Sequence, residues 1–185
     1  MMKKFEEKTI HSTSIFKGRV ISLKVDEVTL PNGKTSNREI INHPGAVAVI
    51  ALTDDNKIIL VEQYRKALER SIIEIPAGKL EKGEEPVETA KRELEEETGY
   101  VAEEITYLQS FATSPGFADE IIHLYVAKHL SVVEEKKQLD EDEFVELLEV
   151  TLEEAEQLVE EGKIYDAKTA FAIIWLKLYL SKETR

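Results

Sequence analysis

The feature that most limits the fold is an unbroken apolar segment at residues 46–52, with the sequence AVAVIAL. Seven apolar residues bounded by turn-forming residues have the length of a β-strand. Their lack of polar alternation predicts a strand that is buried on both faces. After the turn Asp54-Asp55-Asn56, residues 57–64 predict a partner strand rich in Ile and Val. The chain therefore needs a central sheet that is covered on two sides.

One helix interrupts the strands and two follow them. A helix is predicted over residues 86–98, because proline suits the first helical turn and Gly99 can end the helix in a left-handed conformation. The capping-box sequence Thr151-Leu152-Glu153-Glu154 predicts a helix to about Glu161, and apolar residues at helical spacing predict another over residues 167–180. Further strands are expected at residues 72–75, 107–112, 121–127 and 144–150.

Residues 1–42 predict a small antiparallel β unit. Strands are expected over residues 15–30 and 38–42, with the turn signal Pro31-Asn32-Gly33-Lys34 between them. The remaining residues, 43–185, are expected to form the main domain. The order of elements indicates a mixed α/β or α+β sandwich rather than a doubly wound βαβ fold.

The charge of the chain excludes several kinds of partner. Lys and Arg number 24 against 37 Asp and Glu, a formal net charge of −13. Nucleic acids and anionic membranes are bound through basic surfaces, so neither is expected as a partner. The absence of cysteine excludes disulfides, thiolate metal sites and cysteine nucleophiles. No apolar run reaches the roughly 18 residues of a membrane span and no signal peptide is recognisable, so a cytoplasmic location is expected.

Two other patterns do not support a binding site. Gly78 and Gly83 have the spacing of a phosphate-binding loop, but Glu84-Glu85 follows where Lys and then Ser or Thr are needed. The four histidines lack metal-ligand spacing and are interpreted as surface or structural residues: His11, His43, His123 and His129.

Three carboxylates gather along one edge of the helix predicted over residues 86–98. Glu93, Glu96 and Glu97 lie at i, i+3 and i+4, which places them within a sector of about 100°. Their charges repel, and partial burial requires a compensating cation. Carboxylate oxygens at close quarters suit a hard ion such as Mg²⁺ or Mn²⁺. The alternative is a solvated face of a Glu-rich helix.

Residues 78–100, with the sequence GKLEKGEEPVETAKRELEEETGY, resemble the signature of the Nudix hydrolases, G-x5-E-x7-R-E-U-x-E-E-x-G-U, where U is a bulky aliphatic residue. The last position differs, because Tyr100 stands where an aliphatic residue is usual. The resemblance implies a Nudix-type α/β/α sandwich with a mixed sheet and a divalent metal ion on the helix. The matching residues are Gly78, Glu84, Arg92, Glu93, Leu94, Glu96, Glu97 and Gly99.

Three further features resemble the ADP-ribose pyrophosphatase group of that family. Pro115 lies 16 residues beyond Gly99, in the segment Ser114-Pro115-Gly116-Phe117. The segments at residues 62–65 and 74–78 are close to the pattern of the group, and a β unit precedes the main domain. The resemblance implies a homodimer with exchanged N-terminal segments.

The resemblance also implies roles for the matching residues in metal binding and catalysis. Glu141 is expected to activate the attacking water, and the choice between Glu141 and Glu143 for this role stays open. Arg92 and Glu96 are expected as further catalytic residues, with Arg92 orienting neighbouring carboxylates. The metal, Mg²⁺ with Mn²⁺ as the alternative, is expected to be held by the Ala77 carbonyl, Glu93, Glu96, Glu97 and Glu143.

Substrate contacts follow from the same resemblance. They are expected from Arg19, Arg38, Glu39, Arg65, Lys79, Ser114, Pro115, Gly116 and Glu120. For two of these sites a purely structural interpretation stays open: Arg38-Glu39 as a cross-strand ion pair, and Pro115 as an ordinary turn residue.

The resemblance implies Mg²⁺-dependent hydrolysis of ADP-ribose to AMP and ribose 5-phosphate. One alternative is a pyrophosphatase for another nucleoside diphosphate sugar, such as GDP-mannose, or for a dinucleotide. Another alternative is a nucleotide-sensing module without catalytic activity, although such modules usually lose the carboxylates that this chain retains.

Overall fold

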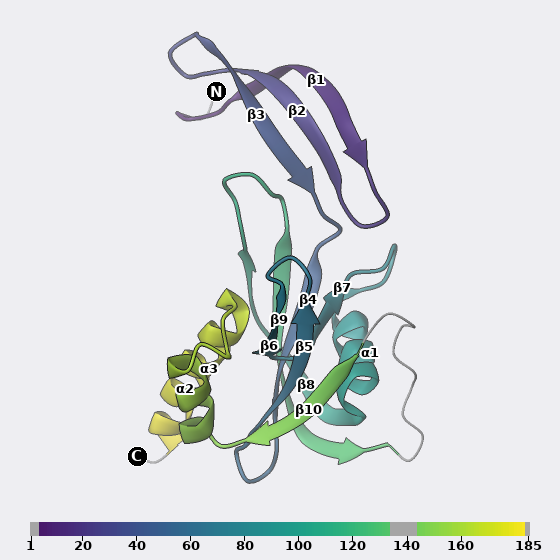
Figure 1. The fold of residues 1–185 in the computed structure, drawn as a ribbon, viewed down its shortest axis with the longest axis vertical. Helices are drawn as coiled ribbons and strands as arrows, with labels where there is room; N and C mark the ends of the chain where they lie inside the picture. Colours follow the sequence, from purple (N-terminus) through teal and green to yellow (C-terminus); the bar gives the residue numbers. More distant parts are fainter. Residues whose placement is uncertain (1–3, 134–143, 184–185) are drawn as a thin grey trace. The chain divides into compact units, whose positions relative to one another are not determined.

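The computed structural model describes residues 4–133 and 144–183 of the 185-residue chain. The chain divides into two compact units. The first comprises residues 1–45 together with 111–122, and the second comprises residues 46–110 together with 123–185. Figure 1 labels the helices and strands of both units.

The first unit is a three-stranded antiparallel sheet in the order β1-β2-β3. Its strands are β1 (Lys8–Lys17), β2 (Ser22–Thr29) and β3 (Thr35–Asn42). The predicted turn joins β2 to β3, and Gly33 supplies the positive φ of 82° that this turn needs. Asp26 of β2 is buried, and it accepts hydrogen bonds from Ser12 and Lys24.

Two parts of this unit differ from the prediction. The strand expected over residues 15–30 is two strands, and β1 begins at Lys8. Every residue of β1 is exposed, so its sequence lacks the apolar alternation that identifies a half-buried strand. In addition, the segment 111–122 packs on the end of β3, where the Ile41 N–H donates to the Phe117 carbonyl at 2.7 Å.

The second unit is built around a mixed sheet of seven strands. Its main path runs in the order β10-β5-β4-β9-β8, while β6 pairs with β5 and β7 pairs with β4. The strands are β4 (Ala46–Leu52), β5 (Ile58–Arg65), β6 (Arg70–Glu74), β7 (Ala77–Lys79), β8 (Tyr100–Ala112), β9 (Ile121–Val132) and β10 (Val145–Val150).

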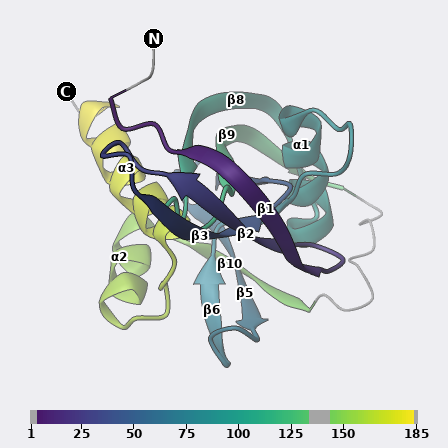
Figure 2. The same cartoon turned by 90° about the horizontal axis from the view of Figure 1, so that it is seen from above.

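Helices cover both faces of this sheet, which explains the unbroken apolar segment. Helix α1 (Pro86–Thr98) lies on one side, and α2 (Leu152–Glu160) with α3 (Ala167–Glu183) lies on the other (Figures 1 and 2). Val47, Val49 and Ala51 of β4 pack in one core cluster with Ala90 and Leu94 of α1. Successive strand residues point to opposite faces, so the residues between them meet the other helical layer.

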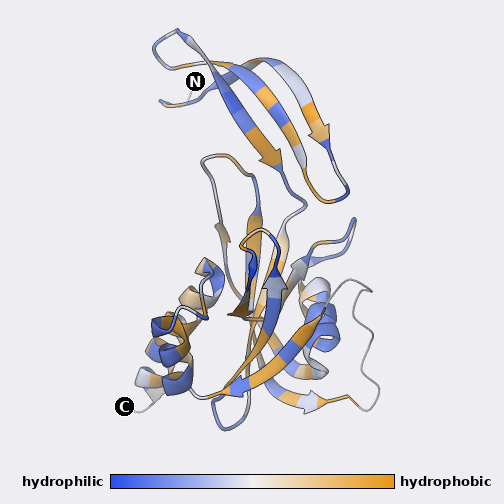
Figure 3. Cartoon of the chain, in the orientation of Figure 1, coloured by the Kyte–Doolittle hydropathy of each residue, from blue (hydrophilic) through white to orange (hydrophobic). Residues whose placement is uncertain are grey.

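Figure 3 shows apolar residues concentrated along the strands between the helical layers. The predicted α/β sandwich with a small antiparallel unit is confirmed, but some strand lengths were wrong. β8 begins at Tyr100, directly after α1, and not at residue 107 as predicted. Its first half was missed because polar residues such as Glu103 and Glu104 interrupt the alternation of apolar residues that identifies a strand. The three-residue strand β7 was missed because it is shorter than the window that a pattern needs. Within residues 4–133 and 144–183, no helix is long and apolar enough to span a membrane.

Candidate active site

Helix α1 has the predicted bounds, and its ends explain how its carboxylates are placed. Pro86 occupies the first turn, and Gly99 ends the helix with a φ of 75° while its N–H donates to the Glu95 carbonyl at 2.8 Å. The apolar side of the helix, with Ala90 and Leu94, is buried against β4. The charged side chains of α1 therefore lie along the edge of the helix that does not pack on β4.

Arg92 joins three carboxylates at this edge. Its Nη1 donates to Glu93 at 2.8 Å and to Glu96 at 2.9 Å, and its Nε and Nη2 donate to Glu84 at 3.2 and 3.1 Å. Partial burial by itself lowers the pKa of Arg92, but these bonds and the nearby charges outweigh it, so the net shift is upward. The hydrogen bonds from Arg92 lower the pKa of Glu84, which therefore stays ionised.

Gly78 allows the Glu93 carboxyl to approach the strand that precedes the helix. β7 pairs with β4 in a register that sets Gly78 opposite Val47. A Cβ atom added to Gly78 would lie 1.9 Å from the Glu93 carboxyl group, far inside any real contact distance. Glu93 is 8% exposed. The glycine therefore leaves space at the point where a carboxylate meets the backbone.

Glu97 ties the same strand to the helix from the next turn. It is 4% exposed, and its Oε2 accepts a hydrogen bond from the Ala77 N–H at 2.9 Å. The preceding carbonyl, of Pro76, accepts a hydrogen bond from the Val49 N–H at 2.9 Å. Ala77, Glu93 and Glu97 are thus held around one short backbone segment.

The chemistry of this donor set fits a hard divalent ion. It consists of carboxylate and carbonyl oxygens, and Gly78 keeps a side chain out of the space beside Glu93. Within residues 4–133 and 144–183, no three acidic or histidine side chains are arranged as a complete metal-binding group. In this structure Glu93 and Glu96 make ion pairs with Arg92. The predicted residues Glu141 and Glu143 lie outside the described part of the chain.

The second unit also contains Arg65 and Lys79. Arg65 ends β5, and its Nε donates to Glu74 at 2.5 Å, while 40% of its side chain is exposed. Lys79 ends β7 and is exposed. Sequence reasoning missed Glu74 as the partner of Arg65. The signal was present, because a glutamate interrupts the apolar run Ile72-Ile73-Glu74-Ile75.

The other predicted substrate residues belong to the first unit. Arg38 makes an ion pair with Glu7, at 2.6 Å, and the adjacent Glu39 is exposed on β3. The structural alternative for Arg38, an ion pair, is therefore present in another form, because the partner is Glu7 before β1 and not Glu39. Arg19 is exposed between β1 and β2.

The segment 113–120 of the first unit forms a hydrogen-bonded turn. The Ser114 carbonyl accepts from the N–H groups of Phe117 and Ala118, while Pro115 and Gly116 at the tip are exposed. Glu120 accepts a hydrogen bond from Thr113. Asp119 accepts from Asn42 at 2.6 Å, and this bond lowers the pKa of Asp119.

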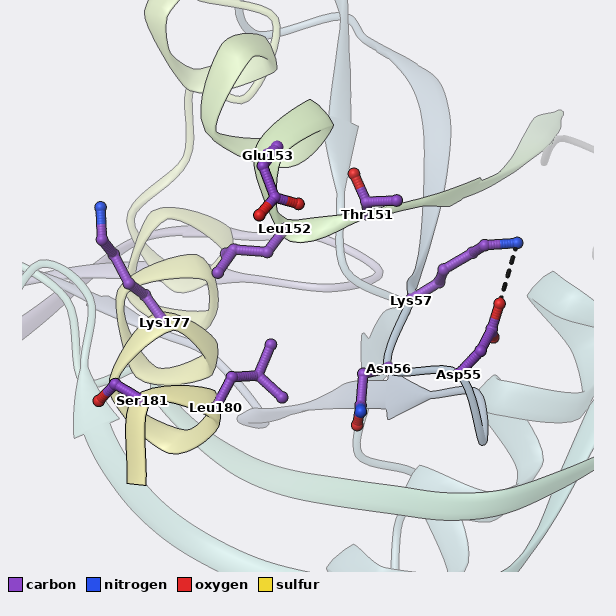
Figure 4. A pocket seen from close by; sticks show the side chains of 9 residues that line it. All are labelled: Asp55, Asn56, Lys57, Thr151, Leu152, Glu153, Lys177, Leu180 and Ser181. Carbon is purple, nitrogen blue, oxygen red and sulfur yellow. Dashed lines mark ion pairs between the residues drawn. The ribbon is translucent and has the colours of Figure 1, made fainter. Parts of the chain in front are cut away.

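A cleft of about 430 Å³ lies at the other end of β4, away from Ala77 (Figure 4). It is formed by the turn after β4, the start of α2 and the last turns of α3. Lys57 and Asp55 face each other there at 3.2 Å. The lining residues are Asp55, Asn56, Lys57, Thr151, Leu152, Glu153, Lys177, Leu180 and Ser181. None of the predicted site residues lines this cleft.

Comparison with known families agrees with the arrangement on α1. The NUDIX domain model matches residues 42–170, and the model of the nucleoside diphosphate sugar hydrolase N-terminal domain matches residues 7–41. The chain belongs to the Nudix hydrolase family. Members of this family generally need divalent metal ions.

Two relatives are similar over almost the whole chain. The ADP-ribose pyrophosphatase of Bacillus subtilis (strain 168) is 66% identical over 177 residues, which cover 96% of each chain. The methanol dehydrogenase activator of Bacillus methanolicus is 67% identical over 178 residues, again 96% of each. A solved structure described as an ADP compounds hydrolase matches with a TM-score of 0.85 over 99% of this chain and 98% of that one. At 21% identity, this last similarity concerns the fold.

Proposed function

We propose that the chain hydrolyses the diphosphate bond of ADP-ribose and releases AMP and ribose 5-phosphate. The observation that carries the proposal is the carboxylate edge of α1, complete in the Nudix signature, in a chain 66% identical to an ADP-ribose pyrophosphatase. The same carboxylates argue against a nucleotide-sensing module without catalytic activity. The cytoplasmic location stays a prediction from the sequence.

The proposed metal is Mg²⁺, held by the Ala77 carbonyl, Glu93 and Glu97, with Glu96 and Glu143 as further ligands. When bound, such an ion neutralises charge on a diphosphate and acidifies a water molecule. Arg92 keeps Glu93 and Glu96 in fixed orientations through bonds of 2.8 and 2.9 Å.

The proposed reaction adds water across the bridge between the two phosphorus atoms. The water oxygen bonds to one phosphorus, the bridging P–O bond breaks, and the bridging oxygen leaves on the other phosphate. Glu141 takes the proton from the water in this scheme. Four positively charged side chains are proposed to contact the anionic substrate: Arg19, Arg38, Arg65 and Lys79. Further contacts with the substrate are proposed from Glu39, Ser114, Pro115, Gly116 and Glu120.

The test is release of AMP from ADP-ribose by the purified chain, with and without Mg²⁺. We expect turnover only with the metal. A panel with GDP-mannose and a dinucleotide tests the closest alternative, because a GDP-mannose pyrophosphatase of Cronobacter sakazakii is 33% identical over 150 residues. A higher kcat/KM on a panel member than on ADP-ribose would reassign the substrate, and ligand binding without any hydrolysis would favour the sensing module.

A second candidate function is activation of a methanol dehydrogenase. It is favoured by the 67% identity to the Bacillus methanolicus activator over 96% of both chains. The test is the rate of alcohol oxidation by a methanol dehydrogenase with and without the chain. Repeating the test with Glu97→Gln shows whether any activation needs the hydrolytic site.

We also propose that two copies form a homodimer with exchanged N-terminal segments, residues 1–42. The support is the exposure of every residue of β1, including apolar Ile10, Ile15 and Phe16, because exposed strands with apolar side chains favour pairing with another chain. Light scattering is expected to give twice the chain mass of 21.1 kDa. A mass of one chain would remove the proposal.

A further inference from the structure

A buried carboxylate that the proposed mechanism does not use lies behind Arg65. Glu74 ends β6 and is 3% exposed, between the apolar neighbours Ile73 and Ile75. A carboxylate in such surroundings is stable only when it is paired. Glu74 has two cationic partners on opposite oxygens: Oε2 accepts from Arg65 Nε at 2.5 Å, and Oε1 accepts from Lys168 Nζ.

Lys168 occupies a costly position for a cation. It lies in the first turn of α3, where the helix dipole disfavours positive charge, and it is 9% exposed. Asp166 offsets this, since its Oδ1 accepts from Lys168 Nζ at 2.9 Å and from the Thr169 N–H at 3.1 Å. The two carboxylates Glu74 and Asp166 therefore account for a buried lysine at this position.

The same turn of α3 also holds the backbone that leads to Ala77. The Ile75 N–H donates to Thr169 Oγ1 at 3.0 Å, and this bond is buried. Arg65, Glu74 and the residues up to Ala77 are therefore fixed from behind by α3, while Glu97 fixes the Ala77 N–H from the front.

The attachment of Arg65 leaves its outer nitrogens available. Glu74 engages Nε, and the Nη atoms make no hydrogen bond to residues 4–133 or 144–183. A guanidinium held at Nε keeps its plane fixed and presents the two Nη groups as a fork, which suits the oxygens of a phosphate.

We propose that Glu74 and Lys168 are positioning residues that hold Arg65 in the orientation needed to bind the diphosphate of the substrate. This inference rests on the proposed function. Lys168 acts indirectly, because it binds Oε1 of Glu74 while Arg65 binds Oε2. By holding the Glu74 carboxylate in place, Lys168 keeps the Arg65 guanidinium at the surface.

The test is a double-mutant cycle between the buried pair and Arg65. In Glu74→Gln/Lys168→Met the buried carboxylate and its ammonium partner disappear together. Asp166 keeps the hydrogen bond from the Thr169 N–H, and the Arg65 side chain is 40% exposed to solvent. We expect KM for ADP-ribose to rise about tenfold with kcat changed less than about threefold, because a phosphate contact of Arg65 binds substrate and transition state alike. Arg65→Ala is expected to raise KM at least as much.

The decisive reading is the combined variant. If Glu74 and Lys168 act through Arg65, adding the pair substitution to Arg65→Ala changes KM by less than about twofold. If the two effects multiply, or if the pair substitution leaves KM unchanged where Arg65→Ala raises it, the inference is wrong. Lys168→Arg on its own, which keeps a cation beside Glu74, is expected to leave KM within about twofold of that of the unmodified chain.

Two controls separate positioning from stability. Lys57→Met/Glu149→Gln removes an ion pair of 2.9 Å at the other end of β5 and is expected to leave KM unchanged. If the buried pair variant is unfolded at the assay temperature, Glu74→Gln alone, which removes one buried charge instead of two, is combined with Arg65→Ala in its place. If the unmodified chain releases no AMP, the proposed function fails. The same cycle is then measured on the calorimetric affinity for ADP, with the same criterion of additivity.

Discussion

Two charged clusters in the second unit differ in their balance of charge. On α1, one guanidinium, Arg92, is shared by Glu84, Glu93 and Glu96. Behind β6, two cations face two carboxylates: Glu74 pairs with Arg65 and Lys168, and Asp166 pairs with Lys168. A cluster rich in carboxylates can accept a further positive charge, whereas a cluster with equal numbers of positive and negative groups has less need of one. The first is suited to bind an ion, and the second to hold a neighbouring group in place.

The largest expected effect comes from removing one carboxylate charge beside Ala77. Glu97→Gln keeps an oxygen that can accept the 2.9 Å hydrogen bond from the Ala77 N–H, so the fold is expected to survive. The kcat for ADP-ribose is expected to fall about a hundredfold or more, because a metal ligand is lost. Steady-state kinetics and circular dichroism check both statements.

The matched control for this variant lies on the same helix. Glu88→Gln removes the same charge from the exposed side of α1, where Glu88 pairs with Lys91 at 2.8 Å. Its kcat is expected to stay within about twofold of the unmodified chain. Equal losses in the two variants would contradict the distinction between the carboxylate edge and the solvated face.

A smaller effect is expected when the space beside Glu93 is filled. Gly78→Ala places a methyl group 1.9 Å from the Glu93 carboxyl, which must move. We expect kcat to fall about tenfold or more and the free energy of unfolding to fall by about 1–3 kcal/mol. The check is urea unfolding of Gly78→Ala in a Glu93→Ala background, where the substitution should lower the free energy of unfolding only a little. If the free energy of unfolding falls as much as it does with Glu93 present, the loss comes from β7 itself and not from contact with Glu93.

A third expectation concerns the ion directly. At a free Mg²⁺ concentration of about ten times its dissociation constant, binding should stabilise the chain by about 1.4 kcal/mol, seen as a higher Tm. Glu97→Gln should lose this shift, and Glu74→Gln/Lys168→Met should keep it, because only the carboxylate-rich cluster binds the ion. KCl at matched ionic strength is the reference. A shift of equal size in all three proteins would indicate a general salt effect.

The smallest effect is a dependence of stability on acid. Hydrogen bonds from Arg92, together with one from Thr89, lower the pKa of Glu84 below its ordinary value of 4.5. Burial has the opposite effect on this pKa, but it is weaker than the hydrogen bonds combined. A depressed pKa in the folded state gives stability that is present above pH 4.5 and is lost as the pH falls through the folded value. Glu84→Gln is expected to flatten this part of the curve of unfolding free energy against pH. An unchanged slope would separate Glu84 from the Arg92 cluster.

The sequence predicted those parts of the molecule that are local. Pro86 and Gly99 define α1, and the spacing of Glu93, Glu96 and Glu97 fixes their common edge. The carboxylate-rich cluster could be predicted because it is built mostly within one helix.

The balanced cluster could not be predicted in the same way. Glu74 and Lys168 are 94 positions apart in the chain, and no periodicity joins a strand end to the first turn of a distant helix. Residues 8–14 of strand β1 were missed for another reason: every residue of this strand is exposed, so apolar spacing carries no information about it. The roles of Glu141 and Glu143 stay predictions from the family resemblance.

The contact between β6 and α3 also has a consequence for biosynthesis. During translation, Glu74 leaves the ribosome long before Lys168 does. Until Lys168 has been made, the Glu74 carboxylate lacks the ammonium group that pairs with it in the core. The backbone that leads to Ala77 also gains a hydrogen-bond acceptor only after α3 has been made, since Thr169 accepts from the Ile75 N–H. A nascent chain therefore completes the support behind Ala77 late, although Ala77, Glu93 and Glu97 emerge earlier.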